Sequence, residues 1–191
     1  VCSSDLDRSV TPLLLTQDID VPVVAVAVHR ESGWPRFALG SAADFDGAAA
    51  ARSALAEAVQ NWLELRGMGR EDAADASGAI GWYADYPEEG DTFIDVDRSV
   101  RAADVGPEER PTGTDELDAL LGRLDDADLD AYATRITTRD VESVGFEAVR
   151  VVCPGAQPLF FDDAYFGQRA RTVPTSLGFE PRLEREHHPF P

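Results

Sequence analysis

The sequence predicts an α+β domain in which helices pack on a mixed sheet, and three observations support this class. The apolar, β-branched run at 21–30 (VPVVAVAVHR) indicates a strand buried on both faces. After a turn, the segment 36–43 (RFALGSAA) returns as a second strand and completes a hairpin. The stretch 127–153 is typical of a strand, a short helix and a strand, which predicts one βαβ unit with both strands in one sheet.

A helix is expected over 47–66, with Asp46 as its N-cap. Its alanine-rich sequence favours helix, and its larger apolar residues recur at helical spacing as Leu55, Val59, Trp62 and Leu63. A further helix is predicted at 114–123. The acidic stretch at about 70–113, rich in Gly, Pro and Asp, is expected to be a long, solvent-facing excursion.

The charge balance excludes several kinds of chemistry. Acidic residues number 36 against 17 basic ones, for a net charge of −19, and every basic residue is arginine. Without lysine the chain lacks the amine of a P-loop, a kinase-like site or a Schiff base. A nucleotide would therefore have to be neutralised by arginine and a carboxylate-bound metal. Such an acidic surface also argues against nucleic acid and against an anionic membrane as partners.

Composition also indicates the environment and cellular compartment of the protein. A carboxylate-rich, lysine-free surface indicates adaptation to high salt. The longest apolar run, 21–28, is too short to span a membrane, and no signal peptide is recognisable. Cys2 and Cys153 show neither metal-ligand spacing nor a disulfide framework. These observations predict a cytoplasmic protein.

The first six residues, VCSSDL, match one reading frame of a common sequencing adapter and are interpreted as an artefact. Residues 7–191 are then expected to be a fragment of one domain, cut on its N-terminal side.

One face of the predicted helix at 47–66 carries polar groups. Ser53, Glu57, Gln60 and Glu64 lie within one arc, away from the centre of the apolar stripe. Glu57 could bind a divalent cation, and Gln60 could hydrogen-bond a phosphate or a carbonyl. From spacing alone, the simpler interpretation is that these residues form the solvent-facing side of an amphipathic helix.

Four segments together suggest a family: Gly40–Asp46, Ala54–Gln60, Ile136–Val141 and Val149–Leu159. The pattern resembles the YcaO family, in which a glycine–serine or glycine–alanine segment leads into a helix of the form A-L-x-E-A-x-Q. The match is spread over about 20–66 and 130–191 and covers the C-terminal half of a YcaO domain.

The resemblance implies an enzyme that uses ATP and Mg²⁺ to phosphorylate a backbone amide oxygen of a peptide or protein substrate. A side chain then yields an azoline, whereas sulfide yields a thioamide. By position, Glu57 would be a Mg²⁺ ligand and Gln60 a contact to the metal or the nucleotide, with Ser53 a weaker member of the site. Possible partners are a sulfur-delivery or leader-recognition protein and a second copy of the chain.

Two C-terminal features extend the resemblance. Arg169, in the segment Tyr165–Arg169, stands where the family places a phosphate-contacting arginine, and Arg171 is the near alternative. The simpler interpretation of Arg169 is a surface ion pair with Asp162 or Asp163. The proline-containing end resembles the tail that cyclising members direct toward the active site, which would bring Pro191 there.

The chain departs from the family at its N-terminal side, where the first serine- and glutamate-bearing helix has no match. Without that half we expect weak ATP binding or none, an unpaired sheet edge and an exposed apolar face. Two alternatives are a non-catalytic YcaO-like accessory protein that binds a peptide or partner enzyme, and an unrelated acidic α+β domain.

Overall fold

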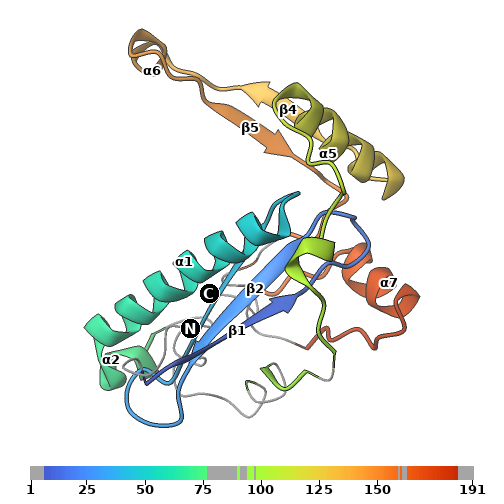
Figure 1. The fold of residues 1–191 in the computed structure, drawn as a ribbon. Coiled ribbons are helices and arrows are strands. Elements are labelled where there is room, and N and C mark those ends of the chain that lie inside the picture. Colours follow the sequence, from blue (N-terminus) through green and yellow to red (C-terminus); the bar gives the residue numbers. More distant parts are fainter. Residues whose placement is uncertain are drawn as a thin grey trace. The chain divides into compact units, whose positions relative to one another are not determined.

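The computed structural model describes residues 7–76, 90, 94–96, 98–158, 160 and 163–184. The chain divides into two compact units, which are treated separately below. The first unit comprises Val1–Pro111, Leu159–Ala164 and Glu184–Pro191, and the second comprises Thr112–Pro158 and Tyr165–Leu183. Each contains helices and an antiparallel sheet, so the predicted α+β class is confirmed (Figure 1).

The sheet of the first unit has the order β1-β2-β3, formed by Ser9–Leu14, Val23–His29 and Phe37–Ala43. The predicted hairpin of β2 and β3 is confirmed, whereas β1 was not predicted. Just after β1, the N–H of Leu15 bonds to the carbonyl of Val23, so the odd-numbered residues of this edge strand carry the bonds to β2. Pro12 is even-numbered, and its backbone groups therefore face away from β2. Proline lacks an N–H and is tolerated at such an edge position.

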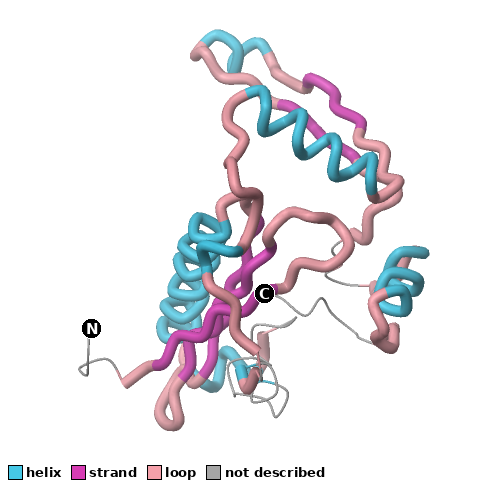
Figure 2. The backbone as a smooth tube through the Cα atoms, turned by 45° about the vertical axis from the view of Figure 1, so that its right-hand side comes forward, coloured by secondary structure: helices cyan, strands magenta, loops and turns pink. Residues whose placement is uncertain are grey.

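Helix α1 (Gly47–Met68) covers one face of this sheet (Figure 2). The predicted N-cap is confirmed, because the Asp46 carboxylate accepts from the N–H groups of Ala48 and Ala49 at 2.9 and 3.2 Å. The contact consists mainly of alanine and valine, with Trp62 and Leu65 as larger members: Val24, Val26, Val28 and Ala38 from the sheet, and Ala50, Ala54, Ala58, Trp62 and Leu65 from the helix.

The predicted apolar stripe of this helix is wrong except at Trp62. Leu55, Val59 and Leu63 are 37%, 43% and 57% exposed, whereas Ala54 and Ala58 are fully buried. The reason is a close approach at Gly40, where a Cβ would lie 2.4 Å from the Ala54 carbonyl oxygen and the Ala58 nitrogen. A helix so close to a strand has room only for alanine at the contact.

The opposite face of the sheet is also buried. Its core consists of Leu13, Ala25, Ala27, Phe37 and Leu39, and Leu15 and Ile94 pack against it. Ile94 belongs to the acidic stretch 70–113, which also forms α2 (Arg70–Ala74) and the 3-10 turn η1 (Ala102–Asp104). Its described part therefore contributes to the core of the first unit as well as to its surface.

The second unit contains α5 (Thr114–Asp126), β4 (Tyr132–Arg135), α6 (Arg139–Ser143), β5 (Val149–Val152) and α7 (Gln168–Ser176). The helix predicted at 114–123 is confirmed. The predicted βαβ unit is wrong, because β4 and β5 pair antiparallel, with α6 in their connection. A parallel pair needs a crossover long enough to carry the chain back along the sheet, and a five-residue helix cannot do so. The described sheets are thus antiparallel rather than mixed.

The two strands of the second unit do lie in one sheet, as predicted. The side chains of both strands are exposed throughout. Arg135 at the end of β4 forms ion pairs with two residues of the connection to β5, Glu142 at 2.9 Å and Glu147 at 2.5 Å. Glu147, and after it Glu142, raise the pKa of Arg135, and hydrogen bonds from Arg135 and then Thr137 lower the pKa of Glu147. No helix in the described part of the chain is long and apolar enough to cross a bilayer.

Candidate functional site

The polar flank of α1 forms the candidate site. Ser53, Glu57 and Gln60 lie at i, i+4 and i+7 of one helix, so the structure brings them together as predicted. Ser53 and Gln60 are exposed, whereas Glu57 is half-buried beside β3. One carboxylate oxygen of Glu57 accepts a hydrogen bond of 2.5 Å from the backbone N–H of Ser41.

This hydrogen bond reaches the outer edge of the sheet. In β3 the even-numbered residues pair with β2, as the flanking bonds Arg30 to Arg36 and Asp44 to Pro22 show. The odd-numbered residues therefore turn their backbone groups outward. Two of these groups are bonded by α1: Ser41 donates to Glu57, and the carbonyl of Leu39 accepts from the side-chain amide of Asn61 at 2.8 Å. We refer to these two bonds as the β3 clamp.

Asn61 was missed in the sequence analysis. It lies one turn after Glu57, at i+4, and it is the only asparagine in the chain. The signal that could have found it is this spacing, since i and i+4 side chains lie above one another on the same flank of a helix. Predicting its partner would have required the position of β3.

A charged cluster also lies at the N-terminus of α1. Arg110 contacts Asp44 at 3.2 Å and Asp46 at 3.4 Å. The pKa of Asp46 is lowered, first by the N–H of Ala49, then by that of Ala48, and less by Arg110. These bonds explain the cluster as a helix cap and its counter-ion.

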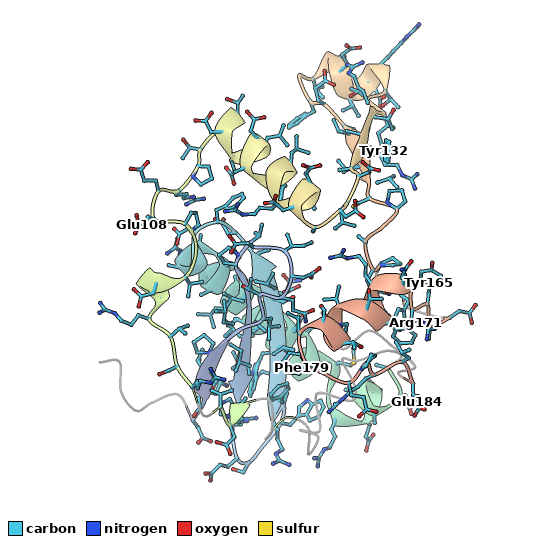
Figure 3. The ribbon with its side chains drawn as sticks, turned by 90° about the vertical axis from the view of Figure 1, so that its right-hand side faces the viewer. Glu108, Tyr132, Tyr165, Arg171, Phe179 and Glu184 are labelled. Atoms are coloured by element: carbon cyan, nitrogen blue, oxygen red, sulfur yellow. The ribbon has the colours of Figure 1, made fainter. Side chains whose placement is uncertain are left out.

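The predicted phosphate-binding arginine belongs to the second unit. Arg169 is half-buried on α7, and its guanidinium donates to the carbonyl of Ala127, just after α5, at 3.0 Å. Arg171 is exposed on the same helix (Figure 3). Arg169 and Glu57 lie in different units, so the geometry of each is described separately. Asp162 and Pro191 lie outside the described residues.

A comparison with protein families matches residues 3–157 to the family described as "YcaO cyclodehydratase", ATP- and Mg²⁺-binding. The chain belongs to the YcaO family. Within this match lie the whole of α1, the edge strand β3 and the hairpin of the second unit, whereas α7 lies beyond it.

The solved structures that resemble this YcaO chain include two heterocyclases. One is a heterocyclase in complex with substrate and cofactor, with a TM-score of 0.73 and 27% identity. The other is the heterocyclase TruD, with a TM-score of 0.69 and 23% identity, a likeness of fold alone. Each match covers 97% of this chain and 25% of the solved one, so the chain spans about a quarter of their length. A comparison with curated proteins finds no match.

The residues of the α1 flank fit the metal that the family description names. Mg²⁺ prefers oxygen ligands and is usually held by one or two carboxylates together with phosphates and water. Glu57 offers a carboxylate and Gln60 an amide oxygen, and the bond from Ser41 uses only one oxygen of Glu57. Among the residues that the structure describes, no three His, Cys, Asp or Glu side chains gather into a metal site. The flank would therefore supply part of a coordination shell.

Proposed function

We propose that this chain forms part of the ATP and Mg²⁺ site of an enzyme that activates a backbone amide of a peptide or protein substrate. The observation that carries the proposal is the half-buried Glu57, held by a backbone N–H beside Gln60 and Ser53, in a chain of the YcaO family. The heterocyclase in complex with substrate and cofactor, which is 27% identical, supports the same reaction class.

The chemistry requires that an amide oxygen become a leaving group. Transfer of the γ-phosphoryl group of ATP to that oxygen makes it one, after which a nucleophile adds to the amide carbon and inorganic phosphate departs. Mg²⁺, when bound, neutralises phosphate charge and orients the phosphates for transfer. Glu57 would hold the cation through the oxygen not bonded to Ser41, and Gln60 would contact the cation or a phosphate oxygen. Ser53 would extend this polar row by one turn.

We assign Arg169 to the phosphates as part of the same proposal. The guanidinium forks onto phosphate oxygens and supplies the positive charge that a lysine-free chain needs. In the described structure this guanidinium also donates to the carbonyl of Ala127. Pro191 would lie near the reacting amide. Whether a side chain or sulfide is the nucleophile distinguishes cyclodehydration from thioamidation, and cyclodehydration is favoured by the heterocyclase structures.

A non-catalytic accessory role is the second candidate. It is the alternative that the sequence leaves open. Such a protein would keep the fold and bind a peptide or partner enzyme without nucleotide.

Nucleotide binding separates the two candidates. Calorimetric titration of the full-length protein with ATP should show binding that requires Mg²⁺. A well-folded protein that binds a substrate peptide, but no ATP at any Mg²⁺ concentration, would be the accessory protein.

A further inference from the structure

We propose that Asn61 is a positioning residue of the proposed Mg²⁺ site: it fixes α1 against the edge of β3 so that the Glu57 carboxylate presents one oxygen to the cation. The inference rests on the proposed function for its consequence. Its geometry, the two bonds of the β3 clamp, stands independently of that function.

The clamp matches donors to acceptors in one register. Leu39 presents an outward carbonyl and Ser41, two residues on, an outward N–H. Opposite them, α1 places an amide donor at position 61 and a carboxylate acceptor at position 57, four residues apart. A rise of about 6 Å over four helical residues corresponds to the span of two strand residues. The same two side chains in exchanged positions would set a carboxylate against a carbonyl.

The alanine contact between α1 and Gly40 fixes the distance of the helix from β3 but constrains its rotation only weakly. The contact of Ala54 and Ala58 with Gly40 sets how closely the helix approaches the strand, since a Cβ on Gly40 would lie 2.4 Å from the helix backbone. The small side chains of Ala54 and Ala58 resist a rotation of the helix about its own axis only weakly, whereas the buried Trp62 and Leu65 oppose such a rotation further along α1. Two directed bonds on one flank resist it strongly, because either bond breaks when the helix turns. Asn61 thereby holds the direction in which Glu57 points.

The β3 clamp thus orients Glu57, the proposed metal ligand. Outer groups that orient a metal-binding side chain are worth about 10–100-fold in metal affinity. Here Ser41 orients the Glu57 carboxylate directly, and Asn61 maintains the position of the helix that makes this bond. Neither group would touch the cation.

The first arm of the test needs neither metal nor nucleotide. Amide hydrogen exchange at Ser41 is measured by NMR in the full chain and compared with Val26, on the central strand β2. In Asn61→Asp, which keeps the size of the side chain but lacks its donors, we expect Ser41 to exchange about tenfold faster while Val26 is unchanged. Asn61→Gln, which keeps the amide, should restore part of the protection. Leu63→Ala, an exposed residue on α1, is the matched control.

The second arm measures the Mg²⁺ dependence of ATP binding in the full-length protein. We expect Asn61→Asp to raise the Mg²⁺ concentration for half-maximal ATP binding about tenfold or more and Asn61→Gln to recover most of this loss. An unchanged Ser41 amide in Asn61→Asp overturns the clamp. Fast exchange with unchanged Mg²⁺ dependence overturns the positioning role and leaves a purely structural one. If Glu57→Gln has no effect on Mg²⁺ dependence, the proposed function fails, whatever the exchange data show.

Discussion

The Glu57 carboxylate accepts a 2.5 Å hydrogen bond from the backbone N–H of Ser41, and this relationship links the fold to the candidate site. For the sheet, the bond satisfies an outward donor on the edge strand β3. For the site, it fixes a half-buried carboxylate in one orientation, and in the proposed function the second oxygen would bind the cation. The structure thus explains why a glutamate on a polar helix flank is more than a solvated charge.

Gly40 is predicted to tolerate no side chain. In Gly40→Ala the new Cβ would meet the backbone of Ala54 and Ala58 at 2.4 Å, so α1 must move away from the sheet. We expect a loss of about 1–3 kcal/mol in the free energy of unfolding. Urea denaturation measures it. Gly67→Ala, where a Cβ meets nothing within 4 Å, is the control, and equal losses in the two variants would contradict the close approach.

The buried face of α1 makes a paired prediction. Ala54→Leu places a large side chain where the wild-type residue is 0% exposed and should destabilise the protein by about 1–3 kcal/mol. Leu63→Ala removes a side chain that is 57% exposed and should cost less than about 0.5 kcal/mol. Thermal unfolding of both variants checks the order. A larger effect at Leu63 would restore the apolar stripe expected from the sequence.

The Asp46 cap predicts a dependence of stability on pH. Its pKa is lowered in the folded state, chiefly by the N–H groups of Ala49 and Ala48, from an ordinary value of 3.8. A lowered pKa gives stability that is present above the unfolded pKa and is lost as the pH falls through the folded pKa. Asn is an equally good cap that does not titrate. The advantage of the wild type over Asp46→Asn should therefore shrink below about pH 4, as urea unfolding across pH 2–7 would show. A constant difference would mean that Asp46 does not titrate with folding.

Arg169 and Arg171 are predicted to differ. Arg169→Ala removes the proposed phosphate contact and should weaken Mg²⁺-dependent ATP binding about tenfold or more, and Arg169→Lys should not restore it, since an ammonium cannot form the guanidinium fork. Arg171→Ala, on the exposed side of α7, tests the neighbouring position. Loss in Arg171→Ala with normal binding in Arg169→Ala would transfer the role to Arg171.

How far sequence reasoning reached can be judged from particular residues. The run 21–30 and the cap Asp46 carry local signals, β-branched apolarity and a helix-start residue, and both predictions hold. The buried face of α1 could not be found this way, because the small side chains at Ala54 and Ala58 are dictated by the distant Gly40. The hydrophobic pattern favoured the larger Leu55, Val59 and Leu63, which the sheet leaves exposed.

The strand pairing of the second unit and the β3 clamp could not be predicted from the sequence for a related reason. Periodicity indicates strands but gives no pairing direction, so the antiparallel pairing of β4 and β5 followed only from the structure. The role of Asn61 depends on an outward carbonyl of Leu39, which no local pattern in α1 encodes. Glu57 and Gln60 were proposed from the family pattern, and their place on one flank followed from helical spacing.

Calorimetric titration of the full-length protein with ATP, with and without Mg²⁺, beside Glu57→Gln tests the central claim most directly. The glutamine can still accept from Ser41, so the fold should persist while the charge for the cation is lost. The account predicts Mg²⁺-dependent binding in the wild type that is weakened at least about tenfold in the folded variant. Equal binding in both proteins, or no binding by a well-folded wild type, would contradict it.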